Sequence, residues 1–316
     1  MHYNHAVRWL KGFRHSPEAI CALYDDDFLF EDVMLDQHGI TSKADLHRLF
    51  GPYANTDPAN GVGIHNFRIK SYVGDRRAGL IRWEWSPEHA GVFLGLDVAG
   101  KPFSTHGHTW HEYNEQGLIT RESSWWDTAA VLRQVGPVSP TKSLTGTKSA
   151  AQARPAPTFT RAEGMDHAAR WCEALGRDTA ALGALYAEQF TLEDTKVDDH
   201  LEDTVTDLDM LAEKLGGLAD GENGRYIFTA TEYLAGRGCG LIHWDVTIDG
   251  ASTYRGLPTG GRTLSTIGST FHQFDEDGRI VLESTHWEDN GVFVQLGLPI
   301  QRPHYWVDGF DPASLG

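Results

Sequence analysis

The sequence predicts an α+β fold present twice, in which an antiparallel sheet curls around helices in each copy. Two observations support this fold class. First, the 316-residue chain aligns with itself at an offset of 162, so that residues 5–9 match 167–171; further along each copy the offset is 161, and Glu122 matches Glu283. Second, each copy begins with helical spacing and then shows strand signals alone. A period this long indicates a duplicated domain rather than a solenoid.

The elements of the first copy follow from local signals. Val7 and Leu10 recur at helical spacing, and Ser16 followed by Pro17 is a typical helix start. Alternating apolar residues and a final turn at 114–117 indicate hairpin strands. The predicted helices are 3–13, 17–24 and 43–50, and the predicted strands begin at 28 and cover 65–73, 78–86, 103–113 and 118–126.

The composition limits the function classes. With 27 Lys and Arg against 44 Asp and Glu, the formal charge is −17, which argues against a partner with a phosphate backbone or an anionic membrane. The N-terminus lacks the basic start and apolar run of a signal peptide, and no segment is apolar enough to span a bilayer. Three widely spaced cysteines make no disulfide framework. We therefore expect a cytoplasmic protein that binds neither nucleic acid nor membranes.

The repeat sets the expected domain boundaries. Domain 1 covers residues 1–136 and domain 2 covers 165–298. Residues 137–164 are rich in Pro, Ser, Thr and Ala and are expected to form a flexible linker. The tail, 299–316, carries three aromatic residues, so it either caps a pocket or covers exposed apolar surface.

Three segments carry a family resemblance: residues 24–38, residues 256–284, and the closing residues 292–297. They resemble the SnoaL-like polyketide cyclases, which belong to the superfamily of nuclear transport factor two and ketosteroid isomerase. The resemblance implies two cone-shaped α+β barrels. Because members commonly pair through the outer faces of their sheets, it also implies a pseudo-dimer of the two halves, with further homo-oligomers possible. The fold itself hosts many activities.

The resemblance to ketosteroid isomerase assigns a catalytic role to Asp32 and Asp194, at the end of the first strand in each copy. They correspond to the carboxylate that takes a proton beside a carbonyl and returns it. The alternative is a solvated or helix-capping aspartate.

A second candidate constellation follows from the last hairpin. Positions 111 and 122 lie nearly opposite each other, and side chains two residues apart share a face. His111 and Glu122, with His272 and Glu283 in the second copy, are candidate acid/base pairs in which the carboxylate orients the ring and raises the histidine pKa. The alternative is a buried structural pair. The same face should hold substrate-binding residues, namely Thr109, Tyr113, Ser124 and Trp126, and in the second copy Thr270, Phe274, Thr285 and Trp287.

The family pattern is not fully kept. The histidine and aspartate that the aromatic cyclases use align with Thr109 and Ser124 in the first copy, and with Thr270 and Thr285 in the second. Cyclase activity is therefore not carried over, although these hydroxyls could donate hydrogen bonds to a carbonyl. After the first strand, Asp36 and His38, and likewise Asp198 and His200, are either further pocket residues or a polar loop.

The leading hypothesis is a cofactor-free acid/base enzyme: an isomerase, dehydratase, cyclase or retro-aldol lyase. It would act next to a carbonyl or hydroxyl of a hydrophobic polyketide, terpenoid, steroid or aromatic substrate. One alternative is a non-catalytic module that binds a hydrophobic ligand. The other is a metal-dependent lyase or hydrolase that uses Asp36, His38, His111 and Glu122, although the resemblance implies no metal.

Overall fold

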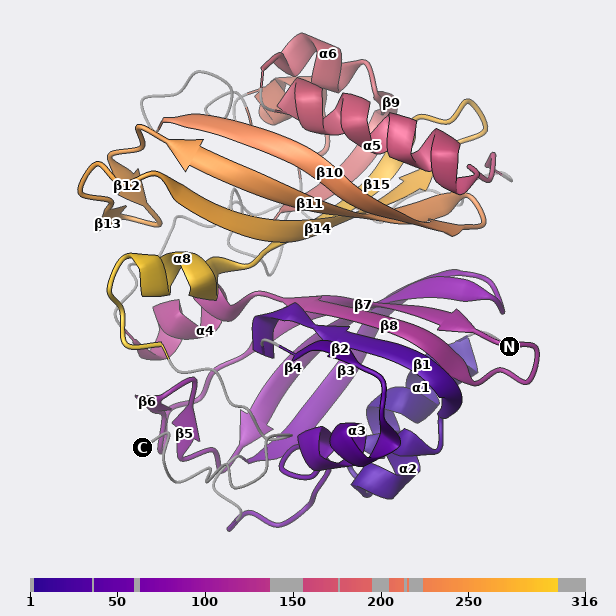
Figure 1. Ribbon diagram of the computed structural model, residues 1–316, viewed down its shortest axis with the longest axis vertical. Helices are drawn as coiled ribbons and strands as arrows, with labels where there is room; N and C mark the ends of the chain where they lie inside the picture. The colour runs from indigo at the N-terminus through magenta and orange to yellow at the C-terminus, as the bar shows by residue number, and fades with distance from the viewer. Residues whose placement is uncertain are drawn as a thin grey trace. The chain divides into compact units, whose positions relative to one another are not determined.

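The computed structural model describes residues 3–35, 37–59, 63–136, 156–175, 177–194, 205–212, 215 and 224–300, without the side chains of residues 3, 35, 37, 38 and 179. The chain divides into two compact units, of which unit 1 is Met1–Pro137 with Leu298–Gly316 and unit 2 is Val138–Gly297 (Figure 1). Each unit has an α+β fold with helices before the main strands, as predicted.

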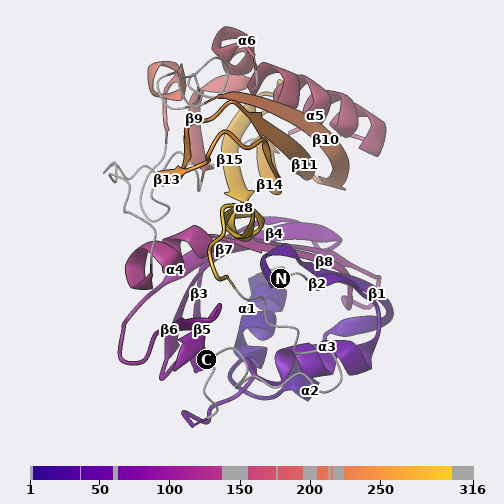
Figure 2. The same ribbon diagram turned by 60° about the vertical axis from the view of Figure 1, so that its left-hand side comes forward.

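Three helices of unit 1 lie on the concave side of its sheet: α1 (Tyr3–Gly12), α2 (Pro17–Cys21) and α3 (Lys43–Phe50) (Figures 1 and 2). Ser16 caps α2 by accepting a hydrogen bond from the backbone N–H of Ala19, at 3.3 Å, and Ser42 caps α3 in the same way through Asp45, at 3.2 Å. The helix start predicted at Ser16 and the third helix at 43–50 are confirmed.

The sheet of unit 1 has the strand order β2-β1-β8-β7-β4-β3. Strand β1 runs parallel to β8, and the other neighbours are antiparallel. Strand β1 begins at Tyr24, before the predicted start at 28, because three consecutive aspartates at 25–27 have low strand propensity and hide it. The strands are β1 (Tyr24–Asp32), β2 (Gln37–Ile40), β3 (Ile64–Gly74), β4 (Ala78–Glu88), β7 (Thr105–Tyr113) and β8 (Ile119–Trp126).

Shorter elements complete unit 1. The 3-10 turn η1 (Val33–Leu35) follows β1, and a small hairpin, β5 (Val92–Phe93) with β6 (Leu96–Asp97), lies between β4 and β7. Helix α4 (Thr128–Val135) ends the unit and is capped by Asp127, which accepts from the backbone N–H of Ala130 at 2.8 Å.

Unit 2 repeats this order within its described residues. Its main sheet runs β10-β11-β14-β15-β9, with β9 parallel to β15. The elements are α5 (Arg161–Leu175), α6 (Thr179–Gly183), β9 (Tyr186–Asp194), β10 (Arg225–Gly236), β11 (Cys239–Asp249), β12 (Thr253–Tyr254), β13 (Leu257–Pro258), β14 (Leu264–Phe274), β15 (Ile280–Trp287) and α8 (Asp289–Gln295).

The start of α5 corrects the predicted linker. Residues 161–164 belong to this helix, because Thr160 and Glu163 form a reciprocal capping box. The Thr160 backbone N–H donates to the Glu163 carboxylate at 2.8 Å, and the Glu163 N–H donates to the Thr160 hydroxyl at 3.3 Å. Residues 137–155 of the predicted linker and 301–316 of the predicted tail lie outside the described residues.

Two features of the sheets shape the interior. A bulge between Ile69 and Ser71 shifts the register of β3 against β4 by one residue, and a bulge increases the local twist of a sheet. Gly107 of β7 leaves room for the Trp83 ring, since a Cβ there would collide with it. In unit 2, Gly268 does the same for Trp244.

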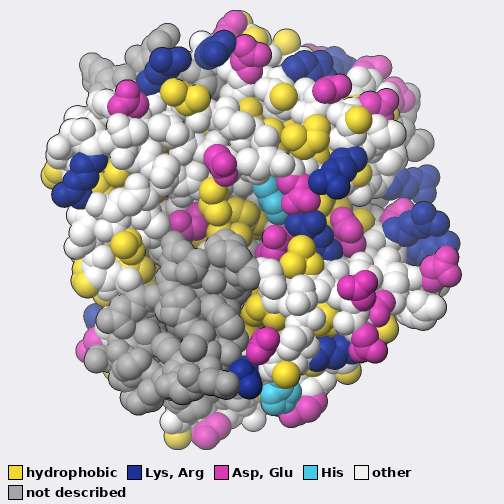
Figure 3. All heavy atoms as spheres, viewed as in Figure 1, with side chains coloured by type: hydrophobic (Ala, Val, Ile, Leu, Met, Phe, Trp, Pro, Cys, Tyr) yellow, Lys and Arg dark blue, Asp and Glu magenta, His cyan; other side chains and the backbone are white. Residues whose placement is uncertain are grey.

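The surface and the cysteines agree with an ordinary globular chain. On the face in Figure 3, acidic side chains are scattered among basic ones. Cys21, Cys172 and Cys239 are buried free thiols. Among the helices that the structure describes, none is both long and apolar enough to cross a membrane.

Candidate functional site

A pocket opens in unit 1 between the helices and the concave face of the sheet. Its lining atoms surround about 600 Å³ of space between them, a figure that includes the open mouth and the solvent in it. The wall is mostly aromatic, with four polar side chains. The lining residues are Trp9, Phe13, Phe30, Asp32, Leu49, Phe50, Tyr53, His65, Phe67, Trp83, Trp85, Phe93, Glu122, Ser124 and Trp126.

The predicted pairing across the last hairpin is confirmed. His111 of β7 lies opposite Glu122 of β8, and its Nε2 is 2.8 Å from a carboxylate oxygen of Glu122. The Tyr24 hydroxyl donates a short hydrogen bond to the same oxygen, and Ser124 donates to the other one at 2.8 Å. His111 Nδ1 lies 3.1 Å from the Tyr113 hydroxyl. Glu122 is 1% exposed. Both oxygens of this buried carboxyl group thus have hydrogen-bond partners within unit 1.

The hydroxyls of Thr109 and Ser124 form a directed chain toward this carboxylate. The Trp83 indole N–H donates to Thr109 at 2.9 Å; since an indole can only donate, Thr109 accepts there and its own proton is free for Ser124, 2.9 Å away. Ser124 in turn donates to Glu122. The expectation that these hydroxyls donate to a substrate carbonyl is therefore wrong for this arrangement, because both protons are already used.

Unit 2 repeats the network around a buried carboxyl group. His272 Nε2 lies 2.9 Å from Glu283, and three further donors reach that carboxylate: Tyr186 at 2.5 Å, Thr285 at 2.9 Å and Trp171 at 3.2 Å. Behind them, the Trp244 indole donates to Thr270 at 2.9 Å, and Thr270 lies 2.9 Å from Thr285. Phe274 takes the place of Tyr113, and His167 Nε2 contacts His272 Nδ1 at 3.0 Å.

Burial decides the protonation of this second pair. It raises the pKa of Glu283 from 4.5 to about 7 and lowers the pKa of His272 from 6.5 to about 3. The expectation that the carboxylate raises the histidine pKa is thus wrong in unit 2, because desolvation penalises the charged form of both groups. His272 is a neutral ring.

Asp32 and Asp194 end strands β1 and β9, as predicted. The Trp126 indole N–H donates to Asp32 at 3.2 Å, and the Trp287 indole N–H donates to Asp194 at 2.9 Å. Asp32 lines the pocket of unit 1, where it can meet a ligand.

Comparison with known proteins agrees with the fold of this unit. Residues 55–135 match the model of the family described as SnoaL-like polyketide cyclase. The matched residues all lie in the first unit. The α+β fold class that the sequence predicted is confirmed. No curated protein matches the chain.

Solved structures resemble less than half of this chain, and with TM-scores below 0.5 they carry no argument about activity. AclR from Streptomyces galilaeus is 17% identical, with a TM-score of 0.36, over 44% of this chain and 98% of that chain. A protein with a ketosteroid isomerase-like fold from Catenulispora acidiphila, in complex with trimethylamine, is 18% identical, with a TM-score of 0.33. The match covers 41% of this chain and 91% of that chain. A SnoaL-like protein from Burkholderia thailandensis is 17% identical, with a TM-score of 0.30. The match covers 42% of this chain and 98% of that chain.

Apart from the unit 2 residues described above, the predicted site residues fall into three groups. Asp32, Glu122, Ser124 and Trp126 line the SnoaL-like pocket. The second group, Thr109, His111 and Tyr113, belongs to the network that supports Glu122. The third group, Asp36, Asp198, His200 and the side chain of His38, lies outside the described residues.

The predicted metal ligands are only partly described. Across the described ranges, no group of three or more His, Cys, Asp or Glu side chains could hold a metal ion. Both ring nitrogens of His111 are within hydrogen-bond distance of protein oxygens, those of Glu122 and Tyr113.

The sequence interpretation missed much of the site, and four of the missed residues make polar contacts there. Trp9 and Tyr24 stand behind Glu122, and both recur in the repeat as Trp171 and Tyr186, a signal that could have identified them. His65 and Trp85 line the pocket, but they differ between the copies, so the repeat gave no signal.

The corresponding interior of unit 2 is packed differently. Tyr226 and Val246 replace His65 and Trp85. The Trp287 ring packs against Trp244, with centroids 4.7 Å apart, and against Phe228, at 5.6 Å.

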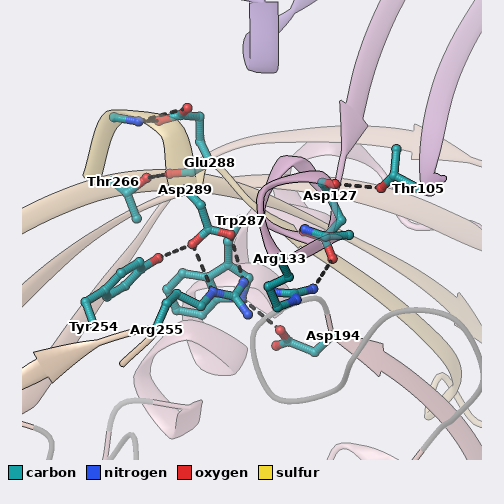
Figure 4. A network of polar contacts seen from close by, with 12 residues as sticks. Thr105, Asp127, Arg133, Asp194, Tyr254, Arg255, Thr266, Trp287, Glu288 and Asp289 are labelled. Atoms are coloured by element: carbon teal, nitrogen blue, oxygen red, sulfur yellow. Dashed lines mark hydrogen bonds and ion pairs between the residues drawn. The ribbon is translucent and has the colours of Figure 1, made fainter. Parts of the chain in front are cut away.

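The β12–β13 hairpin of unit 2 also carries polar contacts that unit 1 lacks at the matching positions. Tyr254, in place of Phe93, donates to Asp289 at 2.5 Å, and Arg255 forms an ion pair with Asp289 at 2.7 Å (Figure 4). Leu94 and Thr128 stand at the positions of Arg255 and Asp289 in the SnoaL-like unit.

Proposed function

We propose that unit 1 is a cofactor-independent enzyme that moves a proton next to a carbonyl or hydroxyl group of a mid-sized apolar molecule. The reaction class is isomerisation, dehydration, cyclisation or retro-aldol cleavage, which share this step. The observation that carries the proposal is an aromatic pocket with two carboxyl groups, Asp32 and Glu122, in its wall. Such a pocket holds an apolar ligand and offers it a base.

The two carboxyl groups come from neighbouring strands. Asp32 lies beside Ser124 in the β1–β8 register, so Glu122 is one strand away and two residues along. Strand spacing and rise then separate the two Cα atoms by about 8 Å. A ligand of a few fused rings can contact both groups. Asp32 is the proposed base, and Glu122, supported by His111 and Tyr24, is the proposed second acid/base group.

We assign the activity to the SnoaL-like unit 1 rather than to unit 2. Its wall contains Phe93, whereas unit 2 has Tyr254 there, held by Asp289. In unit 2, Trp287, which corresponds to the pocket-lining Trp126, packs closely against Trp244. Unit 2 is proposed to act as the structural partner of unit 1.

Deuterium exchange at the carbon next to a ketone tests the proposal directly. 2-Tetralone is a suitable probe, because its acidic C–H protons exchange with deuterated buffer and NMR follows their loss. Asp32→Asn should lower the enzyme-dependent rate by about 10²- to 10⁴-fold. Asp194→Asn, the matched change in unit 2, should leave it near the wild-type rate. Equal rates in wild type and Asp32→Asn would show that Asp32 is not the base.

One observation favours a second candidate function, the binding of a hydrophobic ligand without catalysis. Both oxygens of Glu122 are satisfied by donors from the protein, which is also how a structural carboxyl group is held. Saturable binding of 2-tetralone by the wild type without faster exchange would support this candidate over the enzyme.

A further inference from the structure

His65 carries a buried hydrogen-bond donor without a partner among the described residues, and it is one of the residues that line the SnoaL-like pocket. It lies near the start of β3, is 2% exposed, and its ring contacts Tyr53 edge-on at 4.8 Å between centroids. The Trp85 indole N–H donates to His65 Nδ1 at 2.8 Å. Because an indole nitrogen can only donate, Nδ1 is the acceptor and carries no proton.

The proton of the neutral ring must therefore sit on Nε2. Burial keeps the ring neutral by lowering the pKa of His65 from 6.5 to about 3. Among the described residues, Nε2 has no hydrogen-bond partner. A buried N–H without an acceptor costs free energy, so a position that keeps one calls for an explanation.

We propose that His65 Nε2–H donates a hydrogen bond to an acceptor oxygen, a carbonyl or an enolate, of the molecule bound in the pocket. The inference rests on the proposed ligand pocket but does not require Asp32 to act as a base. A neutral imidazole that holds its proton firmly polarises a carbonyl without giving the proton away. His65 would thus select oxygen-bearing ligands over plain hydrocarbons.

The pairing of His65 with Trp85 is specific to unit 1. Tyr226 and Val246 stand at the matching positions of unit 2, so that copy has neither the ring nor the indole that sets its tautomer. The donor is therefore present in the unit whose wall forms the aromatic pocket. Both members of the pair, the ring and the indole that sets its tautomer, are thus found only in the copy with the aromatic pocket, which supports a role in ligand selection.

Binding of two shape-matched probes tests this role. 2-Tetralone and tetralin share one ring system, but only 2-tetralone has a carbonyl. Calorimetry should show that the wild type prefers the ketone by about 2- to 10-fold, the range expected for one hydrogen bond. His65→Phe should bind tetralin as before and lose the preference, and His65→Gln, which keeps an N–H, should retain part of it. Tyr226→Phe is the matched control and should keep the full preference.

The outcomes separate this inference from the proposed function. Asp32→Asn should keep the preference for the ketone even where proton exchange is lost. A His65→Phe protein that still prefers 2-tetralone, or a wild type that binds both probes equally, would overturn the role of His65.

The tautomer can be checked without any substitution. Nitrogen-15 NMR of the histidine rings should show His65 neutral and protonated at Nε2 at neutral pH, and 2-tetralone should shift that Nε2–H signal while tetralin leaves it in place. A proton on Nδ1, or a ring charged at neutral pH, would contradict the inference. Trp85→Phe should allow both tautomers to appear.

Discussion

Replacing Glu283 by Gln should change how the stability of unit 2 depends on pH. Burial raises the pKa of this carboxyl group from 4.5 to about 7, while Tyr186, Thr285 and Trp171 offset part of that rise by donating hydrogen bonds. The folded state therefore binds a proton more tightly than the unfolded state. The stabilisation that comes from the protonated Glu283 is complete below about pH 4.5 and is lost as the pH rises through 7.

The magnitude follows from the size of this change. Between the ordinary value of 4.5 and about 7, the ionisation of Glu283 in the folded state costs roughly 2.5 × 1.36, or about 3 kcal/mol. Glutamine has no charge at any of these pH values. The free energy of unfolding of the wild type, relative to Glu283→Gln, should thus fall by about 3 kcal/mol from pH 4.5 to pH 8. The neighbouring His272 is present in both proteins, so its own titration largely cancels.

Urea unfolding at a series of pH values measures this difference. Because the chain has two units, the signal must come from unit 2 alone, for example from the amide resonances of β14 and β15. A difference between the two proteins that stays constant from pH 4.5 to pH 8 would refute the reasoning, since it would mean that Glu283 ionises in the fold as it does in water.

Three further predictions follow from single contacts. Gly107→Ala should destabilise unit 1 by about 1–3 kcal/mol and weaken 2-tetralone binding in calorimetry, because the new methyl group collides with Trp83; unchanged binding would contradict this. Tyr24→Phe removes a hydrogen-bond donor from the buried Glu122 and should lower the free energy of unfolding of unit 1, measured in urea, by about 1.5–3 kcal/mol. A loss under about 0.5 kcal/mol would show that the contact is weak. Thr160→Ala should cost about 1 kcal/mol at the start of α5, seen as faster amide exchange in its first turn; exchange at the wild-type rate would argue against the capping box.

Local sequence signals were enough to predict the core of the network. The turn at 114–117 joins β7 to β8, so counting outward from it brings His111 close to Glu122, and a register shift between Glu112 and Tyr113 sets the two directly opposite each other. Alternation along the two strands then puts Ser124 on the same face. The order of helices and strands followed from equally local patterns, which is why the fold class was predictable.

The pairing of His65 with Trp85 could not be found by the same counting. The register next to the turn, where Gly74 pairs with Gly79, would place Trp85 opposite Arg68 and on the other face from His65. The bulge between Ile69 and Ser71 shifts the register by one residue, so Trp85 pairs with Phe67 and shares the face of His65. Nothing in the sequence marks that bulge, and its effect appears only in three dimensions.

The central claim is that the SnoaL-like unit 1 transfers a proton through Asp32. The ratio of deuterium-exchange rates of Asp194→Asn and Asp32→Asn on 2-tetralone tests it most directly, because the two variants differ only in which copy has lost its carboxylate. The account predicts a ratio of about 100 or more. A ratio near one, with both variants as active as the wild type, would contradict it.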